Sequence, residues 1–399
     1  MKRSPRNLPL FGTSRPRLPK AGSVTPGQAR RIVLVTLGLL TATALWQWFP
    51  VSALWIERYY SRQLYPQIAA LLVPLGDAVP FSIAPIVLLT LPLLLFFGLV
   101  RLTRRRRQQG RWVTMLLVAY RLFSVAALLY LAFVVLWGAN YKRQPIEAQL
   151  GLDAGPVSEA EVETLARNLL ALLNDTVEAD RDAARALTAS RLSLQNVVRE
   201  ATGVVPTLPE QIKILPAGTL IRLGGATGVV SPWTLEAHVD GALTPSEHVA
   251  VGLHELAHVA GYSGEADADL IAAIAGLRAD DPFAQYATAL RLFRAASFEL
   301  PSAQRDALWD ELPSRAREDT EMLYRTYRQF LPPAWVSGLQ QFAYDRYLRS
   351  QGVTAGVSDY SRTTTLLVKA VRQGWVSFGD DGPSFSSLGH PGTANTTYH

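Results

Sequence analysis

The sequence contains no cysteine among its 399 residues, which excludes disulfide bonds and zinc sites built from thiolates. Acidic residues are nearly absent from the first third, because residues 1–138 carry 17 basic and 2 acidic side chains, a net charge of +15. Residues 139–399 carry 22 basic and 31 acidic side chains, a net charge of −9, and the overall charge is +6. A protein that binds nucleic acid by charge carries its basic residues on the folded domain, so we expect no nucleic-acid partner.

The basic first third also contains long apolar stretches. Residues 32–54, 81–100 and 115–137 are each long enough to cross the roughly 30 Å of hydrocarbon in a bilayer. Residues 1–31 have eight basic and no acidic side chains and many prolines, which predicts a disordered leader. The lipid bilayer is therefore an expected partner. We expect four parts: a basic leader at 1–31, three transmembrane helices within 32–138, a second domain at 139–380, and a disordered tail at 381–399.

The basic residues that flank the apolar stretches predict an orientation. The leader and residues 101–111, which include four consecutive arginines, are expected in the cytoplasm. The connection 57–80 is nearly neutral and is expected outside, so three crossings place residues 139–399 outside the cytoplasm. Residues 51–53 could also be a signal-peptidase site. We favour a retained anchor, since the long leader and the tryptophans near the end of the first stretch suit a permanent span.

Histidine is scarce, with six in the chain, yet His254 and His258 stand four residues apart with Glu255 directly after the first. On a helix, positions i and i+4 share a face, so both imidazoles can reach one cation. This pattern is typical of a catalytic zinc site in which the carboxylate acts as general base on a zinc-bound water. Residues 244–247 form a capping box with proline at the first helical position, and Gly261 is a natural terminator, so the sequence predicts a helix here.

A third ligand is expected a few residues further on. Gly261 and Gly264 allow a sharp turn, after which an alanine-rich helix from about 265 to 277 can fold back on the first. We predict that Glu265 binds Zn²⁺ and that Asp269, on the same helix face, accepts the outer N–H of a ligating histidine. Asp267 is the alternative third ligand, although it lies on a different face from Glu265.

The second domain is predicted to be mainly α-helical with a small β-sheet. Residues 157–173 have the pattern of an amphipathic helix, with Ser158 as its cap. Short β-like runs follow, separated by glycines: residues 213–215, 220–223, 229–230 and 233–239. Residues 233–239 are our candidate for an edge strand on which an extended peptide pairs. Glu236 and His238 would then be in reach of the substrate or the metal, the alternative for His238 being an ordinary partly buried histidine.

Aromatic and basic residues cluster in two short segments, 57–62 and 137–143, where the first and third apolar stretches end. One interpretation is an interfacial aromatic belt, and the other is a set of contacts that dock the catalytic domain on its anchor. Near the C-terminus, Tyr360 and Arg362 are candidates for stabilising the oxyanion formed on an attacked carbonyl. The alternative for these two residues is a helix-start hydrogen bond and a surface ion pair.

Several of these motifs resemble a known group, the DUF3810 family of bacterial membrane proteins, which has a zincin-type metallopeptidase region. The resemblance runs from about residue 55 to 369. Its motifs are 57–66, 80–82, 137–141, 231–240, 254–269, 344–348 and 356–362. It implies three N-terminal transmembrane helices followed by a zincin-like α+β domain, with zinc on His254, His258 and Glu265 and with Glu255 as base. The chain departs from the expected pattern at residues 267–269, Asp-Ala-Asp in place of Glu-Ala-Asn, and at His238 in place of Asn.

These observations favour a membrane-anchored zinc metallopeptidase. The expected substrate is a peptide or protein at the outer face of the bacterial cytoplasmic membrane, and the chain would cross that membrane several times with its N-terminus in the cytoplasm. The alternative is a non-catalytic membrane scaffold or sensor that holds zinc for structure. A structural zinc usually has four protein ligands, which argues against the alternative.

Overall fold

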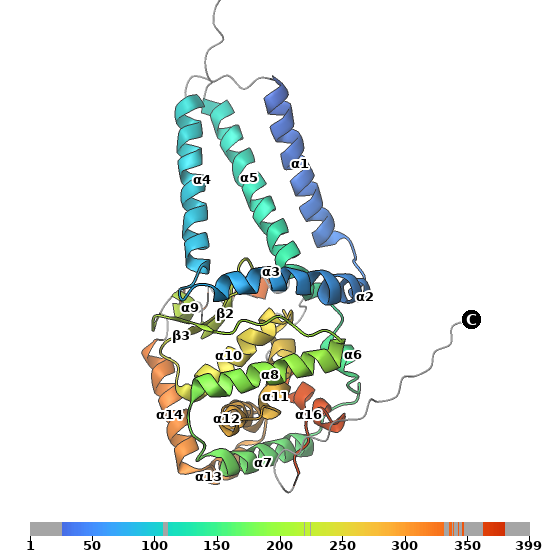
Figure 1. The fold of residues 1–399 in the computed structure, drawn as a ribbon, viewed down its shortest axis with the longest axis vertical. Coiled ribbons are helices and arrows are strands. Elements are labelled where there is room, and N and C mark those ends of the chain that lie inside the picture. Colours follow the sequence, from blue (N-terminus) through green and yellow to red (C-terminus); the bar gives the residue numbers. More distant parts are fainter. Residues whose placement is uncertain are drawn as a thin grey trace, which may run out of the picture. The chain divides into compact units, whose positions relative to one another are not determined.

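The computed structural model describes residues 26–106, 111–218, 220–223, 225–330 and 362–379, with single residues between 335 and 346 (Figure 1). The chain forms two compact units. The first comprises residues 1–45 and 88–130, and the second comprises residues 46–87 and 131–399.

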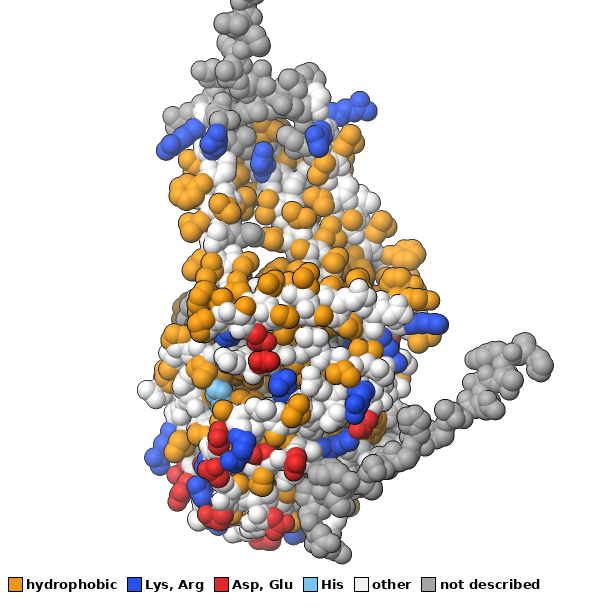
Figure 2. Space-filling view, viewed as in Figure 1, with side chains coloured by type: hydrophobic (Ala, Val, Ile, Leu, Met, Phe, Trp, Pro, Cys, Tyr) orange, Lys and Arg blue, Asp and Glu red, His pale blue; other side chains and the backbone are white. Residues whose placement is uncertain are grey.

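The first unit consists of parts of three long helices: α1 (Pro26–Trp48), α4 (Ala84–Arg106) and α5 (Arg111–Leu136). Ala84–Arg101 and Thr114–Leu136 are long and apolar enough to cross a membrane. Their apolar side chains are largely exposed on the helix surfaces, as Figure 2 shows, and this all-round apolar surface is typical of helices in lipid. By length and composition, two of the three predicted spans are therefore confirmed within the described residues.

The first predicted span has a different form. Residues 33–48 and 53–77 pass the same test only as a pair of helices, which are bent by 110° at the break between them. The break contains Pro50, and a new helix begins with Ser52 as its cap, where the Ser52 hydroxyl accepts from Trp55 N. Proline lacks an N–H and disfavours helical backbone before it, which explains the end of α1 at Trp48. The number of candidate spans is thus two or three.

The second unit is mainly helical and contains the predicted amphipathic helix, α7 (Glu159–Thr176). Ser158 and Glu161 form the capping box at its start. The helix α12 (Pro282–Phe298) is the centre of the core. It packs against α7 and against α8, α10 and α11, whose bounds are Ala183–Thr202, Pro245–Val259 and Glu265–Leu277. The other helices of this unit are α2 (Ala53–Trp55), η1 (Ile56–Leu64), α3 (Tyr65–Asp77), η3 (Gly138–Lys142), α6 (Ile146–Leu150), α8 (Ala183–Thr202), α9 (Leu220–Leu223), α10 (Pro245–Val259), α11 (Glu265–Leu277), α13 (Ser302–Asp310), α14 (Ser314–Gln329) and α16 (Thr363–Arg372).

A three-stranded sheet completes the second unit. The strands are β1 (Lys213–Leu215), β2 (Gly228–Val230) and β3 (Ala237–Asp240), in the order β1-β3-β2. β1 is parallel to β3, and β2 is antiparallel to it. The predicted strand at 220–223 is wrong, because these residues form α9, where the Arg222 guanidinium reaches back to the buried Asp240 carboxylate at 3.0 Å.

The prediction that residues 233–239 form an edge strand is also wrong. Only the end of this run is extended, as part of β3, and β3 is the buried central strand with a partner on each side. Residues 231–235 form a turn in which Leu235 adopts a positive φ of 54° and its N–H donates to the Ser231 carbonyl. Among the described strands, β2 and β1 occupy the edges, so a peptide that adds to this sheet pairs with one of them.

Glu236 and His238 have structural contacts that occupy their side chains. The Glu236 carboxylate accepts from Ile83 N at 2.9 Å and from Ala84 N at 2.7 Å, and it thereby satisfies free N–H groups at the start of α4. The His238 ring lies 2.6 Å from Ser82 Oγ and 3.2 Å from the Val229 carbonyl oxygen. The predicted role of both residues beside the metal is therefore wrong, and His238 is a buried structural histidine.

Candidate metal centre

Helix α10 carries the histidine pair and begins as the sequence predicts. Thr244 is the N-cap, its hydroxyl accepts from Glu247 N, and Pro245 occupies the first helical position. The helix ends at Val259, and Gly261 follows with a φ of +93°, a conformation that favours glycine. A Cβ at Gly261 would also lie 3.0 Å from the Tyr65 ring, so a side chain at this turn would crowd that ring as well as strain the backbone.

The turn after α10 brings the predicted third ligand to the two histidines. Helix α11 begins at Glu265, and Glu265 Oε2 lies 3.2 Å from His254 Nε2 and 3.5 Å from His258 Nε2. One potential ligand atom from each residue lies within 4.8 Å of the others, and all three side chains are buried. Asp267 is half-buried and stands outside this group, and its negative charge acts on Arg143. Of the two candidates for third ligand, Glu265 has the required position.

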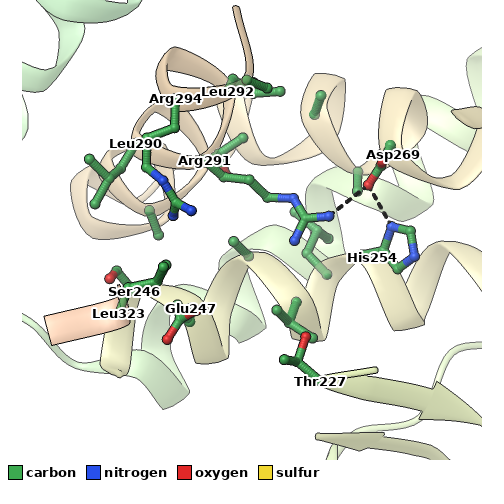
Figure 3. Close-up of a pocket in the computed structure, with 18 of the residues that line it drawn as sticks. Thr227, Ser246, Glu247, His254, Asp269, Leu290, Arg291, Leu292, Arg294 and Leu323 are labelled. Atoms are coloured by element: carbon green, nitrogen blue, oxygen red, sulfur yellow. Dashed lines mark hydrogen bonds and ion pairs between the residues drawn. The ribbon is translucent and has the colours of Figure 1, made fainter. Parts of the chain in front are cut away.

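Contacts on the far side of each imidazole fix its orientation. His254 Nδ1 lies 2.8 Å from Asp269 Oδ1, and His258 Nδ1 lies 2.6 Å from the Tyr262 carbonyl oxygen. Because a carbonyl oxygen only accepts, the His258 Nδ1 carries a proton, which leaves Nε2 as the atom available to a cation. The predicted position of Asp269 behind a histidine of the pair is confirmed. Figure 3 shows Asp269 between His254 and Arg291, whose Nη2 is 3.0 Å from Oδ1.

The charges of the cluster are strongly coupled. Burial disfavours a charged imidazole, but the carboxylates of Asp269 and Glu265 outweigh burial and raise the pKa of His254 to about 10. Burial likewise favours a neutral Glu265, yet His258 and His254 hold the pKa of this carboxyl well below its usual range. The two imidazoles thus stabilise the charged form of the buried Glu265 carboxylate. A divalent cation bound by two imidazoles and a carboxylate would supply the same stabilisation, and this N,N,O set suits zinc.

Glu255 lies beside the cluster and next to the edge strand β2. Its side chain is buried, and burial raises the pKa of its carboxyl above the ordinary value. A Cβ placed on Gly228 of β2 would clash with the Glu255 side chain, so any other residue at this position requires the Glu255 carboxylate to shift. The sequence analysis did not single out Gly228. A glycine in or next to a strand often marks a place where another part of the chain comes close to the strand, and Gly228 stands directly before the β-like run 229–230.

The two aromatic and basic segments contact the end of α10. We call residues 57–65 and 137–143 the collar. Tyr65 Oη donates to the Val259 carbonyl at 2.6 Å, and Trp137 Nε1 donates to the His258 carbonyl at 3.0 Å. Arg143 Nη1 donates to the Gly261 carbonyl at 2.9 Å. The last carbonyls of a helix have no partner within the helix, so the collar supplies partners that α10 lacks. Within the second unit, Tyr65, Trp137 and Arg143 therefore help to hold the end of α10.

A buried ion pair holds the collar together. Glu57, which is 2% exposed, receives Arg143 Nε at 2.9 Å and Arg143 Nη2 at 3.0 Å, and Arg62 Nε contacts its other side at 2.8 Å. Burial would raise the pKa of Glu57, but the two guanidinium groups hold it below its usual value. Arg143 also lies over the Tyr262 ring, 4.4 Å from its centre, and the Tyr262 carbonyl orients His258. The ion pair is thus connected to the candidate ligand His258 through Arg143 and Tyr262.

The structure describes one of the two residues proposed for oxyanion stabilisation. Tyr360 lies outside the described residues. Arg362 Nη2 forms an ion pair with Glu147 at 2.6 Å, and both side chains are partly exposed. This contact agrees with the alternative interpretation of Arg362 as part of a surface ion pair. The next residue, Thr363, instead reaches the site, because its hydroxyl donates to Asp269 Oδ2 at 3.2 Å.

A family model described as "Protein of unknown function (DUF3810)" matches residues 60–368. The chain belongs to the DUF3810 family. The matched region includes most of the collar, the histidine pair, Glu265 and α11, so the family extends over both the membrane-proximal segments and the candidate metal centre. No curated protein and no solved structure matches the chain.

Proposed function

We propose that this protein is a membrane-anchored, zinc-dependent metallopeptidase that hydrolyses peptide bonds. One observation carries the proposal: His254, His258 and Glu265 direct their ligand atoms to a common point, with the buried Glu255 beside them. Within the described residues three ligands converge, and a catalytic zinc typically has three protein ligands and one open position. When bound there, zinc would polarise the scissile carbonyl and lower the pKa of a coordinated water toward about 7.

Glu255 is the proposed general base. A carboxyl whose pKa is raised by burial is better matched to accepting and returning a proton near neutral pH than an ordinary glutamate. Glu255 would take a proton from the attacking water and deliver it to the leaving amine. His254 and His258 keep their orientation through Asp269 and the Tyr262 carbonyl while this proton moves.

The edge strand β2 is the proposed site for the backbone of the peptide. β2 pairs with β3 on one side only, and its Gly228 contacts the proposed base. An extended peptide that pairs with β2 would therefore have its backbone held close to Glu255. From the sequence, residues 233–239 are predicted to pair with the peptide. Because the end of that run lies in the central strand β3, we assign the pairing to the edge strand β2 instead.

The proposed location is the outer face of the bacterial cytoplasmic membrane. The apolar helices α4 and α5 support a membrane anchor, and the four arginines at 104–107 support a cytoplasmic position for the connection between these helices. With the basic leader also in the cytoplasm, the domain at 139–380 lies outside. Reporter fusions after residue 108 and at the C-terminus test this orientation, which predicts cytoplasmic and external signals respectively.

The decisive test uses the full chain purified in detergent micelles. Metal content and digestion of a peptide library are measured for the wild type, Glu255→Gln, Glu265→Gln and the control Glu163→Gln, which changes a partly exposed glutamate of α7. We expect metal in the wild type, Glu255→Gln and the control, a strong loss of metal in Glu265→Gln, and cleavage only by the wild type and the control. Cleavage by Glu255→Gln would exclude Glu255 as base. Stoichiometric metal without any cleavage would favour the non-catalytic scaffold.

A further inference from the structure

A cavity of about 480 Å³ extends from His254 along α10, between α10 and α12. His254 and Asp269 line it at one end, and Figure 3 shows Arg291 and Arg294 of α12 projecting into the same space from the facing helix. A volume of this size lies within the range of small-ligand sites and is ample for one amino-acid side chain. The cavity contributes nothing to the proton transfer proposed above, so its function requires a separate explanation.

The two arginines in the cavity differ in their partners. Arg291 is paired with the Asp269 carboxylate at 3.0 Å, so its charge is already compensated. Arg294 stacks over the Tyr324 ring with its guanidinium carbon 5.4 Å from the ring centre. Its Nε is buried and has no hydrogen-bond partner, and no carboxylate of the described residues forms an ion pair with it. Burial lowers the pKa of Arg294, and the opposing effects of Tyr324 and of the negative charge on Glu247 do not outweigh it.

The carboxylates that line the cavity are bound to other groups. Glu247 accepts from both the N–H and the hydroxyl of Thr244 in the capping box of α10. Asp319 forms an ion pair with Arg181 at 2.7 Å. Asp269 faces His254 and Arg291. Arg294 thus has the charge of Glu247 nearby but no carboxylate of the described residues in ion-pair contact with it, and a partly buried guanidinium of this kind can be stabilised further by an anion from outside the chain.

We propose that this cavity receives an acidic side chain of the bound peptide and that Arg294 binds its carboxylate. The inference rests on the proposed peptidase function, which makes the ligand a peptide. Because the cavity begins at His254, a peptide whose backbone lies at the metal centre can extend one of its side chains into the cavity. A guanidinium offers a planar pair of donors to a carboxylate, and Leu290, Leu292 and Leu323 offer apolar walls to the methylene groups.

The test measures peptide binding to the full chain in detergent micelles, in the Glu255→Gln background so that turnover does not interfere. Fluorescent, amidated peptides carry one glutamate at successive positions of a neutral sequence, and each is compared with glutamine at that position. We expect glutamate at one position to strengthen binding about tenfold or more, the size of a charge-assisted hydrogen bond. Arg294→Gln should abolish this preference, and Arg294→Glu should reverse it in favour of lysine.

Arg325→Gln is the matched control, since it removes an arginine of α14 whose side chain is 81% exposed, and it should keep the preference. Equal binding of glutamate and glutamine peptides, or a preference that survives Arg294→Gln, would overturn the inference. A neutral peptide with a free C-terminal carboxylate forms the second arm. Dependence on Arg294 in this arm alone would assign the cavity to a chain terminus and overturn the side-chain assignment.

These outcomes are separate from those of the proposed function. An acidic preference that depends on Arg294, in a protein whose wild type cleaves no peptide, would support the cavity assignment and count against the peptidase. Cleavage by the wild type without any acidic preference would support the peptidase and overturn the cavity assignment. A reversed preference in Arg294→Glu also rules out a folding defect as the cause, because a misfolded variant would lose binding of the glutamate and the lysine peptides alike.

Discussion

Arg143 is predicted to stabilise the candidate metal centre from the collar, although it is not a proposed ligand. Its guanidinium makes two hydrogen bonds to the buried Glu57 carboxylate, donates to the Gly261 carbonyl and covers the Tyr262 ring. Replacement by methionine keeps an apolar stem of similar length and removes all the donors. We therefore expect Arg143→Met to destabilise the second unit and to weaken metal binding through the displaced turn after α10.

The expected magnitude follows from burial. The side chains of Glu57 and Arg143 are 2% and 6% exposed, and removal of one partner from a buried ion pair costs about 3–5 kcal/mol. Arg62 still contacts Glu57 in the variant, which places the expected loss at the lower end of this range. Arg62→Met is the matched control. Its side chain is 34% exposed, and a partly exposed pair contributes only about 0–1 kcal/mol.

The assay is denaturant-induced unfolding in detergent micelles, followed by tryptophan fluorescence, together with a zinc titration of each variant. The double variant Glu57→Gln/Arg143→Met should lose less stability than the sum of the single variants, because each single variant leaves a buried charge without its main partner and the double variant removes both charges. A loss below about 1 kcal/mol for Arg143→Met, equal to that of Arg62→Met, would refute the reasoning. Unchanged zinc affinity in a destabilised Arg143→Met would restrict the role of the collar to folding.

Three further predictions concern the centre itself. Gly228→Ala should reduce peptide hydrolysis strongly while keeping zinc, because the new Cβ would displace the Glu255 carboxylate. Unchanged turnover would contradict this prediction. Asp269→Asn should weaken zinc affinity by roughly 10–100-fold through loss of the carboxylate behind His254, measured by competition with a chelator. Zinc binding near pH 7 should release protons, because the pKa of His254 is about 10 without a cation. Affinity should therefore rise with pH, and the calorimetric enthalpy should depend on the ionisation enthalpy of the buffer.

Much of the centre could be predicted from local sequence patterns. The spacing of His254 and His258, the capping box at Thr244 and the glycines at 261 and 264 each act over a few residues, and the helices begin and end close to where these signals place them. The same locality explains why the position of Asp269 behind a histidine was predicted correctly. The i,i+4 rule on α11 fixes its place relative to Glu265 once the two helices face each other.

Strand positions were harder to predict, and the reason is physical. Residues 220–223 have a β-like composition, yet a contact between Arg222 and the distant Asp240 accompanies a short helix there. Whether a strand is central or at an edge depends on its partners and not on its own residues, so the edge position was assigned to residues 233–239 when it belongs to β2. Glu236 and His238 were misinterpreted for the same reason, since their partners at 82–84 are about 150 residues away.

The sequence by itself determined the elements whose signals are local: apolar stretches suited to a membrane, the helix with the histidine pair, and the helix that returns with Glu265. Only the tertiary structure decided which groups surround them. The bonds from Tyr65 and Trp137 to the end of α10 join residues 194 and 121 positions apart, and Gly228 meets Glu255 only because β2 packs on α10. Contacts of this kind depend on how whole elements pack, and no short-range pattern in the chain encodes them.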